Sequence, residues 1–175
     1  MGSEWWEAFW FFLPAGISNA SPVLANRIPG LNRWTTPLDF GKHLRDRRIF
    51  GDHKSWRGIL FGTLMAGIFS LVQYQIIEQD SRSVWLILIT GMALGFGALF
   101  GDAVASFFKR RSDVAPGESW FPVDQTDYII GGLLFVYPFV ELSRADVLRI
   151  LVMYFVLHIV ASYIAFHLKL KEKPI

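Results

Sequence analysis

The sequence predicts an all-α integral membrane protein that forms a single domain over residues 1–175. Hydrophobic residues make up 53% of the 175 residues, and the mean hydropathy is +0.36. This composition is too apolar for an ordinary soluble domain. A spanning helix needs about 20 mainly apolar residues, and about five segments meet or approach that length. They are residues 5–25, 57–77, 84–106, 127–141 and 147–168, of which the fourth is short.

The first span contains Pro14, Asn19 and Pro22. Such residues are tolerated at membrane depth only where neighbouring helices or a cavity satisfy the freed backbone groups. We therefore expect the second half of this helix to face protein. The N-terminal end of this segment has Glu4 and Glu7 in place of a basic region, which argues against a cleaved signal peptide.

Glycines recur at four-residue spacing in the second and third spans. The pairs are Gly58 with Gly62, Gly91 with Gly95, and Gly97 with Gly101. Small residues at this spacing allow two helix backbones to approach closely. The pattern predicts tight helix packing, and thin helix faces of this kind also leave room for a lipid tail.

The basic residues predict the topology. Most of the 17 Lys and Arg residues lie in residues 26–57, in residues 107–126 and in the C-terminal tail, whereas the opposite side holds only Arg82, Arg144 and Arg149. Cytoplasmic loops carry an excess of Lys and Arg. We therefore expect an outside N-terminus and two long cytoplasmic loops, at about 26–56 and 107–126. The absence of cysteine excludes disulfides, thiolate metal sites and a cysteine nucleophile.

The first cytoplasmic loop gathers cations, glycines and acids within a short stretch. Its members are Lys42, Arg45, Arg47, Arg48 and Lys54, with Gly41 and Gly51, and with Asp39, Asp46 and Asp52. Lys and Arg donors at this density suit a polyphosphate, which Arg can hold through two parallel hydrogen bonds. The alternative is a basic loop that sets topology and contacts anionic headgroups.

The second loop lies between two groups of carboxylates. Asp102 is near the cytoplasmic end of the third span, and Ser106, Lys109 and Arg110 follow it at helical spacing. Asp124 and Asp127 stand three residues apart at the start of the fourth span. An ionisable residue inside a membrane segment is costly and suggests a function. An Asp at a helix N-terminus can also simply cap backbone donors.

Three carboxylates beside two cations favour metal-assisted chemistry at phosphorus. Mg²⁺ is bound by one or two carboxylates together with substrate phosphates and waters, and such ions can hold the attacking and leaving oxygens of an in-line displacement. We therefore predict that Asp102, Asp124 and Asp127 bind metal, and that Lys109 and Arg110 face phosphate.

One motif of this region resembles a known signature. Ser106, Lys109, Arg110, Gly117, Pro122, Asp124 and Asp127 follow the pattern S-x2-K-R-x6-G-x4-P-x-D-x2-D. This is similar to the signature of membrane-integral CTP-dependent cytidylyltransferases, the phosphatidate cytidylyltransferase superfamily. The His-Gly-Gly element of bacterial and eukaryotic members is absent. The stretches PLDFGK, RRIFGDHKSWRG and GDAVASFFKRR resemble instead the archaeal branch, the CDP-archaeol synthases. The resemblance covers about residues 14–127.

The resemblance implies an activity, a cofactor and partners. Members transfer a cytidylyl group from CTP to 2,3-di-O-geranylgeranylglyceryl phosphate, an isoprenoid diether glycerol phosphate, and release pyrophosphate. Mg²⁺ is the expected cofactor, and no nucleic-acid partner is expected. The location implied is the cell membrane, with the active site facing the cytoplasm. The oligomeric state stays open.

The resemblance and the loop composition together assign roles to eleven positions. We expect Asp102, Lys109, Asp124 and Asp127 to be catalytic. We expect the remaining seven to bind substrate or cofactor: Asn19, Asp39, Lys42, Lys54, Arg57, Ser106 and Arg110.

Other readings compete with this one. An ester-linked phosphatidate is an alternative lipid substrate. A CDP-alcohol phosphotransferase would show an Asp-Gly-x2-Ala-Arg run, which is absent. A transporter would carry polar residues through the middle of several helices, whereas the second and fifth spans offer only scattered ones, such as Thr63, Ser70, His158 and Ser162.

Overall fold

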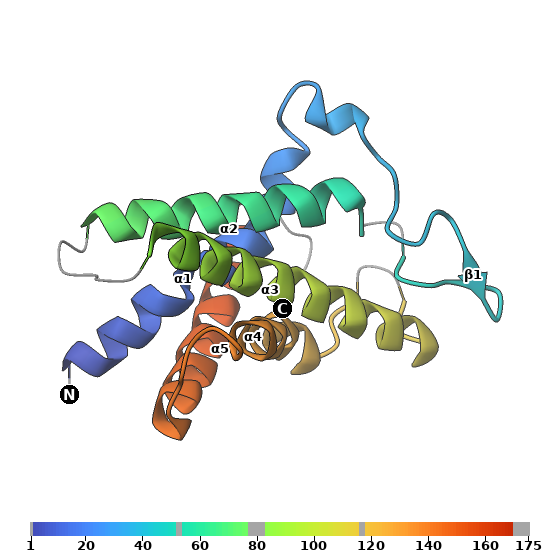
Figure 1. Cartoon of the computed structure of the whole chain (residues 1–175). Helices are drawn as coiled ribbons and strands as arrows, with labels where there is room; N and C mark the ends of the chain where they lie inside the picture. Colours follow the sequence, from blue (N-terminus) through green and yellow to red (C-terminus); the bar gives the residue numbers. More distant parts are fainter. Residues whose placement is uncertain (1, 52–53, 77–82, 116–117, 170–175) are drawn as a thin grey trace.

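The computed structural model describes residues 2–51, 54–76, 83–115 and 118–169. It consists of helices joined by one long and several short connections (Figure 1). The α-helices are α1 (Gly2–Ala25), α2 (Trp56–Ile76), α3 (Val84–Arg111), α4 (Val123–Val136) and α5 (Arg144–His167). The long connection before α2 contains a 3₁₀ turn, η1 (Leu31–Arg33), and an antiparallel hairpin of β1 (His43–Leu44) and β2 (Arg47–Arg48).

Four helices among the described residues, α1, α2, α3 and α5, are long and apolar enough to cross a membrane. The fourth predicted span differs from the structure: α4 begins at Val123, before the predicted start, and ends at Val136 after 14 residues. Pro138 follows this end and lacks the amide hydrogen that another turn would need. The third predicted span continues through Lys109 to Arg111, because cations are favourable at a helix C-terminus and do not stop a helix.

Helix α3 lies at the centre of the fold, with α2 and α4 packed along it and α1 across it (Figure 1). Its glycines allow this approach. A β-carbon on Gly101 would overlap the Asp127 carbonyl oxygen and stand 3.0 Å from the carbonyl carbon. A β-carbon on Gly97 would meet the backbone of Gly131 in the same way. The prediction of tight packing from the glycine spacing is confirmed.

The two prolines of α1 lie within the helix, and a neighbouring helix compensates for the first of them. Pro14 cannot donate to the carbonyl of Trp10, and the Gln73 side chain of α2 donates to that carbonyl at 2.7 Å. One turn further on, the buried Ser18 hydroxyl donates to the carbonyl of Gly95 at 3.0 Å. The expectation that this part of α1 faces protein is confirmed for the face that contains Pro14 and Ser18.

Helix α5 is attached to the rest of the bundle by hydrogen bonds from two tyrosines. The Tyr128 hydroxyl donates to the carbonyl of Tyr154 at 3.0 Å, and the Tyr154 hydroxyl donates to the carbonyl of Phe9 at 2.6 Å. At the start of α5, Ser143 and Asp146 form a capping box. Arg149 bonds Glu4 of α1 at 2.7 Å. These contacts join the first and last helices.

The connection before α2 and the connection between α3 and α4 lie at the same end of the helices (Figure 1). The hairpin of the first loop lies beside the C-terminal end of α3, and Arg47 donates to the carbonyl of Arg110 at 2.8 Å. The two regions that the sequence places in separate loops therefore form one surface.

Candidate active site

Two lysine–carboxylate pairs mark this surface. The Lys54 ammonium, just before α2, is paired with the Asp102 carboxylate of α3. The Lys109 ammonium lies 2.5 Å from Oδ2 of Asp124. All four side chains are partly buried. Each pair therefore joins an acid and a base from different segments of the chain. The two acids belong to α3 and α4, which pack against each other.

Asp127 lies one turn after Asp124 on α4. Its carboxylate is within electrostatic range of both Asp102 and Asp124, and its backbone carbonyl packs against Gly101, the neighbour of Asp102. The backbone N–H of Tyr128 donates to Asp127 Oδ1 at 2.5 Å. The structure thus places the three predicted metal-binding carboxylates around the contact of α3 with α4.

The carboxylates match Mg²⁺ in chemical type, because this ion prefers hard oxygen ligands. Within the described residues, however, no three acidic or histidine side chains are gathered closely enough to coordinate one ion as they stand. Asp102 and Asp124 instead point at lysines. An ion bound between these helices would take the place of the lysines as the partner of the carboxylates. The donor set therefore fits a magnesium ion.

Asp124 also makes a local contact beside the start of α4, although it does not accept a hydrogen bond from an amide of the helix itself. Asp124 lies in the first turn of α4, and its carboxylate accepts the backbone N–H of Trp120 at 2.8 Å. The N-cap position itself is Pro122, which offers no side-chain hydrogen bond. Asp124 therefore both organises the entry to α4 and presents a charge to Lys109.

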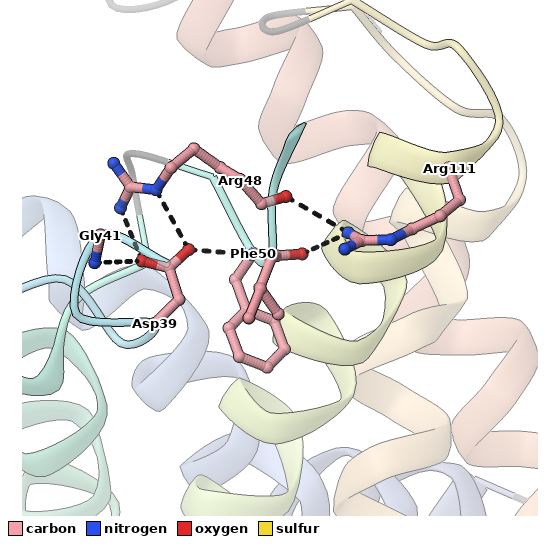
Figure 2. A network of polar contacts seen from close by, with 6 residues as sticks. Asp39, Gly41, Arg48, Phe50 and Arg111 are labelled. Carbon is pink, nitrogen blue, oxygen red and sulfur yellow. Dashed lines mark hydrogen bonds and ion pairs between the residues drawn. The ribbon is translucent and has the colours of Figure 1, made fainter. Parts of the chain in front are cut away.

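Asp39 is the centre of the first loop (Figure 2). Its buried carboxylate accepts from the Arg48 side chain at 2.6 and 3.3 Å, and from the backbone N–H groups of Phe50 at 3.1 Å and Gly41 at 3.0 Å. Burial opposes ionisation, but these donors hold the pKa of the Asp39 carboxyl below its usual range. The contacts give Asp39 a part in building the loop, which differs from the substrate-binding or cofactor-binding part predicted for it.

Arg57 also has structural contacts. Its guanidinium is buried, donates to the carbonyl of Leu31 at 3.0 Å and pairs with the Asn26 side chain. It therefore joins the start of α2 to the first part of the loop. The substrate-binding or cofactor-binding role predicted for Arg57 stays a prediction.

The other predicted residues are more open. The Lys42 side chain is exposed on the hairpin, and Asn19, Ser106 and Arg110 are partly exposed. The Arg110 side chain lies against Gly51, 3.9 Å from the place that a β-carbon would occupy there. The roles assigned to these four residues stay predictions. Gly117 of the sequence signature and Asp52 of the first loop lie outside the described residues.

Arg111 has contacts with the hairpin, although no role was predicted for it. It is the third of three consecutive cations, and it donates to the carbonyls of Arg48 at 3.2 Å and Ile49 at 2.7 Å. Helical spacing from Lys109 and Arg110 offered a signal, because three consecutive residues of a helix point in three directions. The three side chains could therefore not all point into the same site.

Comparison with known proteins decides the family. Residues 5–175 match the family described as CarS-like: CDP-archaeol synthase. The chain belongs to the CDP-archaeol synthase family. Members from Thermococcus onnurineus and Pyrococcus furiosus are each 39% identical to this chain, over 168 residues with 95% of both chains covered, and over 169 residues with 96% of both covered.

A solved structure supports the same assignment. It is described as an intramembrane enzyme for archaeal membrane lipid biosynthesis, and it superposes with a TM-score of 0.75 at 29% identity, covering 89% of this chain and 92% of that chain. The predicted family resemblance and the all-α membrane fold are confirmed. The match also extends beyond residue 127, through α5. As a member of the CDP-archaeol synthase family, the chain is an enzyme of the nucleotidyltransferase class.

Proposed function

We propose that this chain transfers the cytidylyl group of CTP to an isoprenoid diether glycerol phosphate, giving CDP-archaeol and pyrophosphate. The observation that supports this most strongly is the meeting of Lys54 with Asp102 and of Lys109 with Asp124 at one end of α3, in a member of the CDP-archaeol synthase family. Lysine side chains suit the phosphates of CTP and of the lipid, and carboxylates suit the metal ion that accompanies them.

The reaction forms one bond and breaks another at the same phosphorus. An oxygen of the lipid phosphate attacks the α-phosphorus of CTP, and the bond from that phosphorus to the oxygen bridging to the β-phosphorus breaks. Pyrophosphate leaves with the electron pair of the broken bond. A phosphomonoester has a second pKa of about 6, so the attacking oxygen is already ionised at neutral pH. The enzyme therefore needs positioning and charge neutralisation more than a strong general base.

The site residues divide between these two tasks. Lys54 and Lys109 neutralise phosphate oxygens after leaving their carboxylate partners, and Arg110 extends the cationic surface toward the first loop. Asp102, Asp124 and Asp127 would hold Mg²⁺, which when bound supplies further positive charge to the phosphates. The carboxylates meanwhile keep the two lysines extended toward the site before substrate arrives.

The site faces the cytoplasm in this proposal. The first loop and the end of α3 hold most of the cations and lie together (Figure 1), and such loops stay on the cytoplasmic side. CTP is then available to the site directly, while the lipid phosphate reaches it from the inner leaflet.

Pyrophosphate release by the purified protein tests the activity. We expect release with CTP, geranylgeranyl diether phosphate and Mg²⁺, and loss of release when a chelator removes the metal. Each of the other nucleoside triphosphates serves as a control for the base. Phosphatidic acid in place of the diether tests the preference for the lipid substrate. A higher rate with phosphatidic acid would show that the ester lipid, and not the diether, is the preferred substrate. No release with any nucleotide, from protein shown to be folded, would overturn the enzymatic proposal.

Lys54→Met is expected to raise the KM for CTP. A hydrogen bond to a charged group contributes about 1.5–3 kcal/mol, which corresponds to about 10- to 100-fold in affinity. Initial rates against CTP concentration measure the change. Arg45→Met is the matched control, because it removes one positive charge from the exposed tip of the same loop. An unchanged KM in Lys54→Met would return the first loop to a role in topology.

A further inference from the structure

Arg111, in the last turn of α3, joins the first loop to the helix end (Figure 2). Its Nη1 donates to the carbonyls of Arg48 at 3.2 Å, Ile49 at 2.7 Å and Phe107 at 3.1 Å. The guanidinium carbon lies 3.9 Å from the centroid of the Phe107 ring. One side chain thus contacts the hairpin backbone and its own helix together.

The hairpin is connected in turn to Lys54. Asp39 holds Arg48 and Phe50 from within the loop. Next to Asp39, the backbone N–H of Leu38 donates to the carbonyl of Lys54 at 2.8 Å. Pro37 and Ser55 form an isolated β-bridge beside this bond. Hydrogen bonds, together with the covalent links within Arg48 and between Asp39 and Leu38, therefore connect Arg111 to the backbone of Lys54.

We propose that Arg111 is a positioning residue, which docks the first loop on the end of α3 and thereby sets Lys54 against Asp102. This inference rests on the proposed function, because it assigns Arg111 a part in the use of CTP. Arg111 acts through Lys54 and does not itself contact substrate. What distinguishes Arg111 is that it donates to the carbonyls of two consecutive residues, Arg48 and Ile49, at the end of the hairpin.

A simpler role for Arg111 would be to complement the dipole at the C-terminus of α3. Its bond to the Phe107 carbonyl and its stacking on the Phe107 ring agree with that role. Lys109 and Arg110 lie in the same turn and already supply charge there. The dipole does not require contacts with Arg48 and Ile49, and those contacts are what distinguish docking from capping.

The arginine is required for its shape as well as its charge. A guanidinium is planar, stacks on aromatic rings and presents several donors in fixed directions, whereas an ammonium is a compact and strongly hydrated charge. We therefore expect Arg111→Lys to restore only part of what Arg111→Met loses. A role in the dipole alone would let lysine replace arginine fully.

Kinetics of pyrophosphate release test the proposal. Arg111→Met should lower kcat/KM for CTP on the order of 10²-fold, the loss expected from small misplacement of a reacting partner. Arg45→Met should leave it unchanged. In a protein that already contains Lys54→Met, Arg111→Met should add little, because residues that act through one another are non-additive. Full additivity of the two losses, or wild-type kinetics in Arg111→Met, would overturn the proposal.

Hydrogen exchange supplies a readout that is independent of activity. Amides of residues 37–51 should exchange faster in Arg111→Met than in wild-type protein, while those of α5 stay unchanged. The same segment should exchange normally in Arg45→Met. Unchanged exchange in Arg111→Met would overturn the docking role. If wild-type protein released no pyrophosphate, the proposed function would fail, and the exchange measurement would still decide whether Arg111 docks the loop.

Discussion

Asp124→Asn is expected to reduce pyrophosphate release by on the order of 10²–10³-fold, the range seen when one electrostatic contact to the reacting group is removed. Asparagine is nearly the same size and can still accept the Trp120 N–H, which Asp124 accepts at 2.8 Å. It lacks the negative charge that pairs with Lys109 and that would help to bind Mg²⁺. The variant therefore separates the charge of Asp124 from its local hydrogen bond. Rates measured across a range of Mg²⁺ concentrations, with thermal unfolding in detergent, give both quantities.

Asp113→Asn is the control for this experiment. Asp113 is an exposed acid just after α3, paired with Arg47, and asparagine tolerates its positive φ of 60°. It should retain wild-type turnover and wild-type Mg²⁺ dependence. If Asp124→Asn instead kept its activity and lost only modest stability, Asp124 would be a helix-organising residue without a part in the chemistry.

Gly101→Ala is expected to impair both stability and activity. The new methyl group would overlap the Asp127 carbonyl oxygen and stand 3.0 Å from its carbonyl carbon, and backbone atoms cannot rotate away as a side chain can. Overpacking of this kind costs about 1–3 kcal/mol. The helices must separate locally, which shifts Asp102 relative to Asp127. A lower unfolding temperature together with a lower kcat, in protein that still folds, is the predicted result.

Gly16→Ala is the matched substitution elsewhere in the bundle. There the β-carbon would lie 3.3 Å from Cε1 of Tyr154, the edge of a side chain that can yield by a few tenths of an ångström. It should change the unfolding temperature little and the kcat not at all. Equal effects of the two alanines would show that contact between α3 and α4 at Gly101 is not a special requirement of the site.

The helices could be predicted from hydropathy, but their ends could not. Hydropathy detects apolar residues, so it stopped the third span at 106 although α3 continues through its cations to Arg111. It also placed the start of the fourth span too late, at residue 127, although the polar residue Asp124 already belongs to α4. The end of α3 and the start of α4 both extend beyond the apolar part of the chain and into the candidate site.

The hairpin of the first loop gave no recognisable signal. Its turn consists of Arg45 and Asp46, with φ of 52° and 62°. Two-residue hairpin turns with positive φ usually contain Asn-Gly or Asp-Gly, and neither dipeptide occurs here. The strand after the turn is held by contacts from outside the hairpin: Arg47 bonds the Arg110 carbonyl, Arg48 bonds Asp39, and Arg111 bonds the Ile49 carbonyl. Such contacts join residues that are distant in sequence, and local patterns do not reveal them.

The candidate site was predicted as a set of residue types rather than as a set of pairs. Helical spacing places Lys109 and Asp102 near one helix end, and the three-residue spacing of Asp124 and Asp127 places both at the start of the next span. The pairing of Lys54 with Asp102 spans 48 positions of sequence, and the sequence offers several other lysines and arginines that Asp102 could meet. The fold decides which of these cations pairs with Asp102, because the first loop folds back on α3 and brings Lys54 beside it.

The length of α4 has a consequence for the surrounding lipid. Its 14 residues measure about 21 Å at 1.5 Å per residue, while the hydrocarbon core of a bilayer is about 30 Å thick. Ile130, Leu134 and Tyr137 are exposed along this helix and its end, so one side of it meets lipid. A short hydrophobic element makes the adjacent bilayer thin, at a cost of fractions of a kcal/mol per ångström. The bilayer beside α4 is therefore expected to be thinner than elsewhere, so that headgroups lie closer to the mid-plane next to the helix that contains Asp124 and Asp127.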